Sequence, residues 1–305
     1  MTQPAIPRID AQKMIVRDPA TMVELKRGVM DVGFLTLHNT ALTGPRVANI
    51  FDVYRMFFQL PESAKQAVNM AATGSNRGWG ASGSEQVDPD ANPDYKQVFD
   101  CGFELGADDP LTDLDVYAPN RWPDLSLFQS VIQTYYGEAL IVAMNILRGV
   151  AAAIGEPAHY FDDKFTRPMA LLRGNYYPER PRWAGDNDFG IAAHTDYGCV
   201  TLLATDGVPG LEVRKRGGGW IPVNEQPGTF VINFGEMLEM WTDGRVVATP
   251  HRVVGGPQER ISVPMFFNPN HDANVAPIGS GKTIIAGEHL DKRFKETYVH
   301  LQEKS

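Results

Sequence analysis

Cysteine is scarce in this sequence, and long apolar runs are missing from it. Only Cys101 and Cys199 occur among 305 residues, and two cysteines so placed match neither a disulfide scaffold nor the ligand spacing of a zinc site. We therefore expect both to be reduced, buried thiols. No stretch approaches the ~20 consecutive apolar residues that a membrane-spanning helix needs, so we expect no membrane partner.

A concentration of positive charge is also missing. The formal net charge is -9 with a pI near 5.3, and no block of Lys or Arg suggests a surface that follows phosphates. A small basic cluster, Arg214 to Arg216, is followed directly by glycines, which is typical of a solvated hairpin tip. We therefore expect no nucleic acid partner.

The first residues of the chain do not resemble a signal peptide. Pro4, Pro7 and several charges interrupt them before an apolar segment can form, so we expect a cytoplasmic location. With 43% hydrophobic and 21% charged residues, the composition is that of an ordinary soluble globular protein. The sequence carries no signal for an oligomeric state.

Residues 1–165 show mainly helical patterns. Apolar residues recur at helical spacing on both sides of a short extended segment at 33–39, and again from about 124 to 154, where glycine and proline end the longest expected helix. Residues 73–93 are rich in Gly, Ser, Asn and Asp and indicate a long loop. Loops of this length are often functional lids.

From residue 169 to 268 the pattern changes to short β-branched and aromatic segments separated by Gly, Pro and Asp turns. They predict a mainly β fold with flanking helices, whose core is a two-sheet jelly roll, also called a double-stranded β-helix. We expect a single domain, 1–305. Within it the helical section, 1–165, packs on a catalytic core at 166–275, and 276–305 form a C-terminal turn and helix.

Three side chains suggest a metal site. Side chains alternate between the two faces of a strand, so the triplet His194-Thr195-Asp196 would place its first and last members on one face. His251, in the apolar segment TPHRVV, is the natural third ligand. Two imidazoles and one carboxylate on one side of a metal leave the opposite positions open, as in iron(II) oxygenases. Zinc is the alternative metal for such a set.

Two further polar pairs have the same spacing in expected strands. Arg260 and Ser262 together make a good receptor for a carboxylate, and Asn175 and Tyr177 form the other pair. Polar pairs on strands that otherwise bury apolar side chains are costly unless they meet around a shared polar site. The pattern therefore favours a barrel interior with a metal and an anion-binding socket beside it.

With these motifs in order, the chain resembles the isopenicillin N synthase-like family of iron(II) and 2-oxoglutarate-dependent dioxygenases. The resemblance covers nearly the whole chain and depends on the ordered combination rather than on any one motif. Its segments are GFLTL, RGWG at 77–80, KQVFD at 96–100, NYYP at 175–178, HTDYGCVTLL at 194–203, GLEV at 210–213, GGWIPV at 218–223, VINFGEMLEMWTDG at 231–244, HRVV at 251–254 and RISVPMFFNPN at 260–270.

The resemblance implies a role for each matching residue. His194, Asp196 and His251 would be the iron ligands, Arg260 and Ser262 would bind the distal carboxylate of 2-oxoglutarate, and Tyr177 and Asn175 would help to hold this cosubstrate. It further implies Fe(II), 2-oxoglutarate and O2 as cofactor and cosubstrates. The implied reaction couples decarboxylation of 2-oxoglutarate to hydrogen abstraction from a small organic molecule, giving hydroxylation, desaturation or ring formation.

Three alternatives compete with this interpretation. Some family members, such as isopenicillin N synthase, keep the Arg-x-Ser pair without using 2-oxoglutarate, so an oxoglutarate-independent Fe(II) oxidase is the first. A hydrolytic zinc site or a purely structural module is the second. The third is a nucleotide-binding loop at APIGSGKT, residues 276–283, although the flanking sequence shows neither the strand before it nor the helix starting at its Lys-Thr that such a loop needs.

Some aromatic and charged residues are candidates for the substrate pocket, with Trp79 on the loop that would close over the iron. The candidates are Trp79, Phe99, Arg173, Tyr197, Phe266 and Phe267. For any single aromatic the more common role is core packing, and Arg173 is as well explained by a structural ion pair. The remaining histidines lack partner spacing and are expected at the surface or in packing: His38, His159, His271, His289 and His300.

Overall fold

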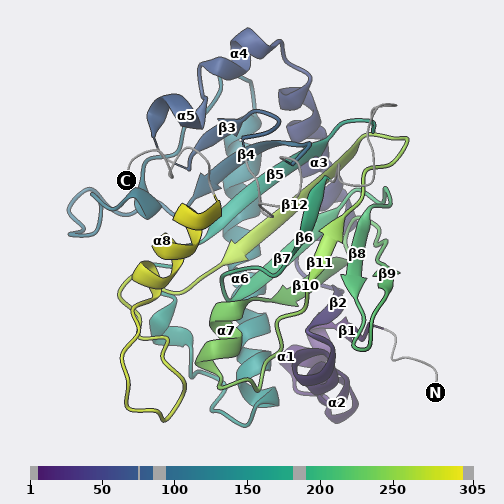
Figure 1. Cartoon of the computed structure of the whole chain (residues 1–305), viewed down its shortest axis with the longest axis vertical. Coiled ribbons are helices and arrows are strands. Elements are labelled where there is room, and N and C mark those ends of the chain that lie inside the picture. The colour runs from purple at the N-terminus through teal and green to yellow at the C-terminus, as the bar shows by residue number, and fades with distance from the viewer. Residues whose placement is uncertain (1–5, 75, 85–93, 181–189, 298–305) are drawn as a thin grey trace.

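The computed structural model describes residues 6–74, 76–84, 94–180 and 190–297, with side chains up to residue 293. In Figure 1 the strands form one large twisted sheet and a smaller one in front of it, with helices around them. The sheets are the layers that position the candidate site.

The larger sheet has eight strands in the order β1-β2-β10-β7-β12-β5-β4-β3, and the smaller one has four in the order β6-β11-β8-β9. The bounds of the strands in the larger sheet are β1 Arg8–Asp10, β2 Phe34–His38, β3 Gly78–Gly80, β4 Gln97–Gly102, β5 Leu171–Tyr177, β7 Val200–Thr205, β10 Phe230–Phe234 and β12 Arg260–Phe267. Those of the smaller sheet are β6 Ile191–His194, β8 Leu211–Arg214, β9 Trp220–Pro222 and β11 His251–Val253.

The short segments expected between residues 169 and 268 are the strands β5 to β12. Their arrangement in two sheets confirms the expected jelly-roll core with flanking helices. The N-terminal section contributes more β structure than its helical patterns suggested, because β1 and β2 extend one edge of the larger sheet and β4 and β3 extend the other. Of these four strands only β2 was expected, from the extended segment at 33–39.

The expectation of a long loop at 73–93 is partly wrong. Residues 85–93 lie outside the described residues, but Gly78–Gly80 form β3, which pairs antiparallel with β4. A strand this short is too brief for alternation to appear in its sequence, and its pairing partner lies outside the expected loop.

Helices cover the sheets on their outer side and at their ends (Figure 1). The α-helices are α1 Ala11–Ile15, α2 Pro19–Arg27, α3 Gly44–Phe58, α4 Glu62–Gln66, α5 Met70–Thr73, α6 Phe128–Ala153, α7 Glu236–Trp241 and α8 Ala286–Thr297. A π-helical turn at Gly28–Val32 and 3-10 turns at Asp115–Tyr117 and Asp162–Lys164 complete the set in the described residues.

The longest helix, α6, is apolar and long enough to cross a membrane by length and composition alone. In the fold it contacts α2, α3 and the strands β7 and β12, and it buries a stripe that includes Ile132, Tyr135 and Ile146. Helical spacing of these apolar residues explains the buried stripe. In this fold α6 is a core helix.

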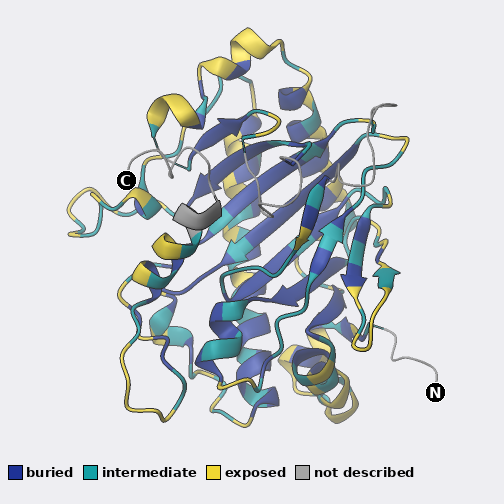
Figure 2. Ribbon diagram, in the orientation of Figure 1, coloured by how far each residue is buried: buried dark blue, intermediate teal, exposed yellow. Residues whose placement is uncertain are grey.

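The strands of the larger sheet are mostly buried, and the exposed residues gather mainly on the peripheral helices and loops, as Figure 2 shows for α4 and α5. On β5 the backbone lies close to α3, because a Cβ at Gly174 would come 2.4 Å from the ring of Tyr54. Only glycine allows this approach. Tight packing on the α3 side of Gly174 fixes the strand whose neighbouring residues, Arg173 and Asn175, line a cavity on the other side.

Candidate active site

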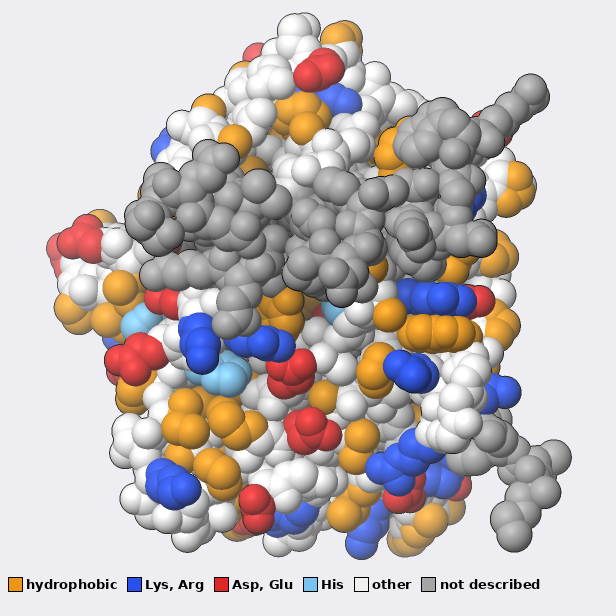
Figure 3. All heavy atoms as spheres, in the orientation of Figure 1, with side chains coloured by type: hydrophobic (Ala, Val, Ile, Leu, Met, Phe, Trp, Pro, Cys, Tyr) orange, Lys and Arg blue, Asp and Glu red, His pale blue; other side chains and the backbone are white. Residues whose placement is uncertain are grey.

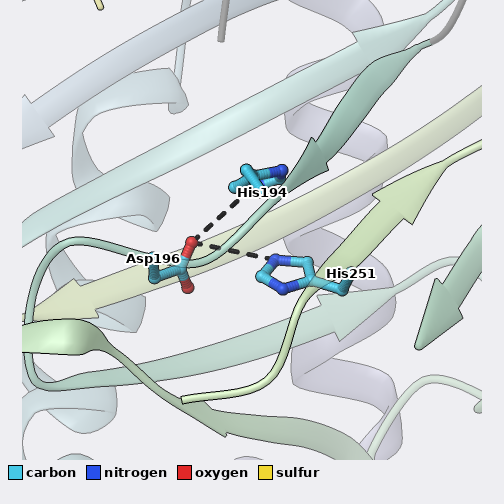
Figure 4. Close-up of side chains that lie close together, drawn as sticks. All are labelled: His194, Asp196 and His251. Atoms are coloured by element: carbon cyan, nitrogen blue, oxygen red, sulfur yellow. Dashed lines mark ion pairs between the residues drawn. The ribbon is translucent and has the colours of Figure 1, made fainter. Parts of the chain in front are cut away.

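The three expected metal ligands converge. His194 ends β6, His251 begins β11, and the two residues lie directly opposite each other in the ladder between these strands. One donor atom from each of His194, Asp196 and His251 can be chosen so that all lie within 4.8 Å of one another. Figure 4 shows both imidazoles beside the Asp196 carboxylate, each joined by a dashed line to the same carboxylate oxygen.

The reason for the convergence differs from the one expected. β6 stops at His194, so Asp196 lies in the following loop and strand alternation does not place it beside the histidine. Each Nε2 lies 3.7 Å from Asp196 Oδ1. That separation is too long for a hydrogen bond. It suits donors of one ion, since atoms each about 2.0–2.2 Å from a metal can lie up to ~4.4 Å apart.

Both imidazoles are oriented by backbone carbonyls. His194 Nδ1 lies 2.8 Å from Ala192 O, and His251 Nδ1 lies 3.4 Å from Thr249 O. A proton on Nδ1 that is donated to a carbonyl leaves Nε2 with its lone pair toward a metal. The edge of Phe34 also packs against the ring of His251, with centroids 5.4 Å apart. The rings therefore present their donor atoms to a shared point.

The carboxylate is oriented in the same way. Asp196 Oδ2 accepts hydrogen bonds from Asn233 Nδ2, at 2.6 Å, and from the hydroxyl of Thr201. Asn233 and Thr201 are direct neighbours across β10 and β7. These two bonds occupy Oδ2, so Oδ1 is the atom that faces both imidazoles.

The protonation states suit a metal. Burial alone would raise the pKa of Asp196, but the imidazoles of His251 and His194 and the two hydrogen bonds to Oδ2 lower it. Burial and the nearby His194 lower the pKa of His251 to about 4, against the opposing effect of Asp196. A carboxylate and a neutral imidazole are the forms that bind a metal, and they are present without one.

The expected cosubstrate residues also meet. In the ladder between β12 and β5, Arg260 lies opposite Tyr177 and Ser262 lies opposite Asn175. All four are buried. The guanidinium of Arg260 lies over the ring of Tyr177, 5.1 Å from its centroid, and Nε donates to Val208 O at 3.2 Å.

One hydrogen-bond donor among these four residues is not used within the described part of the chain. Arg260 Nη1 is buried and has no hydrogen-bond partner among the residues that the structure describes. A buried guanidinium N–H without an acceptor is costly, and a carboxylate is the acceptor that a guanidinium matches best. The residues present therefore fit the distal carboxylate of 2-oxoglutarate.

A cavity of about 440 Å³ opens beside the metal ligands. His194 and Asp196 line it, and so do Asn175, Arg173 and Tyr197. Its volume lies within the range of ordinary small-molecule sites. The open side of the metal centre therefore faces a space that can hold a small organic molecule.

Comparison with known proteins agrees with this geometry. Residues 168–269 match the model of the 2OG-Fe(II) oxygenase superfamily, and residues 6–125 match a model described as the N-terminal part of non-haem dioxygenases in morphine synthesis. A homoarginine-6-hydroxylase of Oryza sativa is 31% identical over 97% of this chain and 98% of its own length. The chain belongs to the 2-oxoglutarate–Fe(II) oxygenase superfamily. The expected family and its cofactors, Fe(II), 2-oxoglutarate and O2, are confirmed.

Solved structures show the same likeness. A full-length Neurospora crassa protein crystallised in complex with alpha-KG superposes with a TM-score of 0.85 at 28% identity, covering 97% of both chains. A 2OG-Fe(II) oxygenase family protein from Caulobacter crescentus gives a TM-score of 0.81 at 26% identity, over 97% of this chain and 99% of its own.

The loop that carries Asp196 is held by the start of α7. Glu236 N donates to Asp196 O at 2.8 Å, and Gly235 N donates to Cys199 O at 3.0 Å. A Cβ at Gly235 would lie 2.3 Å from Gly198 O, so only glycine allows the helix to approach this closely. The motif FGEMLE in the oxygenase thus sets the loop geometry that strand alternation does not.

The Glu236 side chain extends the same support to the C-terminal helix. Its Oε1 accepts the hydroxyl of Thr195, the residue between the two ligands, and its Oε2 accepts Arg293 Nη2 at 2.7 Å. Arg293 also lies over the ring of Tyr197, 4.5 Å from its centroid. Glu236 was missed at the level of the sequence, where its only signal is an acidic residue at the start of a short helix.

Replacing Glu236 by glutamine is expected to weaken Fe(II) binding by roughly two- to tenfold, because an amide cannot accept both charge-assisted hydrogen bonds and the loop between the ligands is held less firmly. The Kd for Fe(II) can be measured by anaerobic titration in the presence of 2-oxoglutarate. Glu288→Gln, the same change at an exposed position of α8, is the control. Equal affinity in the Glu236 and Glu288 variants would contradict a positioning role.

The expected pocket residues divide into two groups. Arg173, Tyr197 and Phe266 line the cavity. Trp79, Phe99 and Phe267 do not line this cavity; they are buried in the hydrophobic core, with exposed fractions of 2%, 0% and 2%.

Their surroundings explain why. Trp79 lies on β3 rather than on a closing loop, and its indole donates to Gln97 Oε1 at 3.0 Å. Phe267 packs on Phe165, with ring centroids 4.7 Å apart. Each of these side chains is engaged in packing between the sheet and the helices.

One histidine was misjudged. His271 was expected at the surface or in packing, but it lines the cavity. His159 forms a surface pair with Asp162, with 2.8 Å between Nδ1 and Oδ2, as a surface role predicts. His300 lies outside the described residues. No spacing in the sequence could have singled out His271, because its place depends on the fold of the segment after β12.

The nucleotide-loop alternative is not supported. A phosphate-binding loop needs its helix to open at the Lys-Thr pair, but α8 begins at Ala286 and Lys282 lies in a segment that is neither helix nor strand. Gly279 and Gly281 have φ values of 80° and 67°, which are those of turn residues. The segment is a surface turn.

Proposed function

We propose that this oxygenase oxidises a small organic molecule held in the cavity, with Fe(II) bound by His194, Asp196 and His251 and with 2-oxoglutarate bound at Arg260. The observation that carries the proposal is the convergence of the three donors, with His194 and Asp196 lining the cavity, in a chain that also buries Arg260, whose Nη1 has no partner among the described residues. Bound iron supplies the dioxygen chemistry and the oxidation of the substrate.

The chain itself supplies binding, orientation and exclusion of water. Arg260 donates to the distal carboxylate of 2-oxoglutarate, while Ser262 and Tyr177 supply hydroxyls from the same face of the sheet, and Asn175 supplies an amide at the wall of the cavity. Because all four are buried, water does not compete for these contacts.

The substrate is proposed only as a class. The Neurospora protein was solved with thymine and with 5-formyluracil, whereas several curated relatives are homoarginine-6-hydroxylases. These compounds share their small size and little else. Hydroxylation, desaturation and ring formation all begin with removal of a hydrogen atom from the substrate, and the geometry favours none of them.

Partners and location stay predictions. On the face drawn in Figure 3, acidic and basic side chains of the described residues are intermingled and no extended basic area appears. The absence of a nucleic acid partner stays a prediction from the net charge of -9. Cys101 and Cys199 are buried free thiols, as expected for a reducing compartment such as the cytoplasm.

The test is an anaerobic titration of the protein with Fe(II) and 2-oxoglutarate. The expected result is a visible charge-transfer band that saturates at one iron per chain and needs both components; admission of air then yields succinate. Zn(II) in place of Fe(II) should give neither signal. Oxygen uptake that proceeds equally without 2-oxoglutarate would favour the oxoglutarate-independent alternative, and no uptake with Fe(II) would contradict an oxygenase.

A further inference from the structure

A group of buried charges forms part of the cavity wall at the β3 edge of the larger sheet. Arg77, Lys96 and Arg173 line the cavity, although their exposed fractions are only 2%, 3% and 6%. Asp94 and Asp100 lie beside them with exposed fractions of 2% and 0%. The sheet brings these residues together, because β3, β4 and β5 are adjacent and Asp100 lies opposite Arg173.

Two of the three cations are paired with carboxylates. Arg173 donates to both oxygens of Asp100, from Nε to Oδ1 at 2.8 Å and from Nη2 to Oδ2 at 2.6 Å. Lys96 Nζ donates to Asp94 Oδ2 at 2.7 Å. Each aspartate therefore offsets the charge of one cation.

Arg77 is different. Its Nη1 donates to Asn76 O at 2.8 Å and its Nη2 donates to Val116 O at 2.5 Å, and both acceptors are neutral carbonyls. Its Nε is buried without a hydrogen-bond partner in the described part of the chain. Within the described residues, this part of the wall thus contains three cations and two carboxylates, and the surplus positive charge lies on Arg77.

The position of Arg77 is closely defined. A Cβ at Gly102 would lie 2.2 Å from Nη2 of Arg77, so the guanidinium lies directly against the backbone of β4. Burial lowers the pKa of Arg77, against the opposing effect of Cys101 and Asp100. A cation held in a buried place without a carboxylate is costly unless another group compensates it.

The cosubstrate is not that group. Arg260, which receives 2-oxoglutarate in the proposed function, lies opposite Tyr177, whereas Arg173 is four residues earlier on the same strand, roughly 13 Å away along it. Asp113, Asp115 and Asp291 also line the cavity, but they are exposed, and water screens their charge. The buried wall is therefore a second place for an anion.

We infer that this wall binds an anionic group of the prime substrate, a carboxylate in the simplest case, with Arg77 as the residue that selects for it. The inference rests on the proposed function and adds the substrate class: a small organic acid whose carbon skeleton extends from the wall toward the metal ligands. Lys96 and Arg173 contribute to the positive potential while their aspartates keep them in place.

The test compares binding of matched probes to the Fe(II)–2-oxoglutarate form of the whole chain without air. The probes are benzoate, benzamide and benzylamine, and hexanoate, hexanamide and hexylamine, and the readout is the change each causes in the charge-transfer band. In each set the acid is expected to bind at least about tenfold more tightly than the amide or the amine, as a charge-assisted contact predicts.

Arg77→Gln should reduce the acid preference to less than about twofold, and Arg77→Lys should retain part of it because the charge remains. Arg121→Gln, the same change at an exposed residue whose Cβ lies 3.5 Å from the position a Cβ would take at Gly78, should keep the full preference.

The possible outcomes distinguish failure of the proposed function from failure of the anionic subsite. A wild-type protein without the charge-transfer band would contradict the proposed function itself. If the band forms but no acid binds, or the amides or amines bind as tightly as the acids, the anionic subsite is overturned while the oxygenase assignment stands. The same holds if Arg77→Gln folds and keeps the acid preference. The ranking of the probes on the wild type needs no variant, so misfolding of Arg77→Gln cannot rescue the inference.

Discussion

Replacing Asp196 by alanine is expected to abolish 2-oxoglutarate turnover. The change removes the only anionic donor of the three and leaves the neutral imidazoles of His194 and His251, which bind Fe(II) more weakly and no longer fix its open side. Loss of a residue that hydrogen-bonds to a metal ligand lowers metal affinity or activity about 10- to 100-fold. Loss of the ligand itself should exceed that range. Succinate formed in air with saturating Fe(II) is the measurement.

Three comparison variants make the result specific to the metal. Asn233→Ala removes only a hydrogen bond to Asp196, so succinate formation should fall by roughly 10- to 100-fold. Asp52→Ala, at an exposed residue of α3, should have wild-type activity. Succinate formation should fall as far in His194→Ala as in Asp196→Ala. Succinate formation within tenfold of the wild type in both ligand variants, with iron bound, would overturn the assignment of the ligands.

The metal ligands were accessible from the sequence because each lies in a short motif of its own. The two residues His194 and Asp196 are close in the chain, and HRVV marks the strand that must lie beside them. The reason given for their approach was nevertheless wrong. The strand ends at His194, and the loop after it is shaped by the amides of Gly235 and Glu236 at the start of α7. That support comes from residues distant in the sequence, so the sequence around His194 and Asp196 carries no sign of it.

The pocket residues were predicted less well because both faces of the larger sheet are buried. Phe266 and Phe267 are neighbours on β12 and point to opposite faces, so Phe266 lines the cavity and Phe267 packs against the helices. In a sheet with one wet face, polarity would tell these faces apart. Here both faces are buried, and only strand parity distinguishes them: Phe266 shares its face of β12 with Arg260 and Ser262, whereas Phe267 does not.

Buried charges posed the opposite difficulty. Arg77 and Asp94 are charged residues in or beside a Gly-rich segment, and such residues are usually exposed. In the fold both are nearly inaccessible, because the pairing of β3, β4 and β5 brings them to the cavity wall. Arg173 was recognised as either a pocket residue or half of an ion pair, and the structure shows that it is both.

Replacing Arg260 by alanine is expected to raise the KM for 2-oxoglutarate by about 10- to 150-fold, with a smaller effect on kcat. This range follows from the roughly 1.5–3 kcal/mol that a hydrogen bond to a charged group contributes. The contact is made in the ground state as well as during the reaction, so its loss appears mainly in KM. The measurement is succinate formation over a range of 2-oxoglutarate concentrations.

The geometry also predicts how other replacements at this position behave. Arg260→Lys keeps the charge, but lysine cannot donate to Val208 O and to a carboxylate from one planar group, so its KM should lie between those of the wild type and the alanine variant. Arg46→Ala, at an exposed arginine paired with Glu138, should leave KM unchanged. Because Arg260 Nη1 has no protein acceptor, 2-oxoglutarate should raise the Tm of the wild type but hardly that of Arg260→Ala. An equal rise in both proteins, or an unchanged KM in the variant, would mean that the cosubstrate carboxylate is held elsewhere.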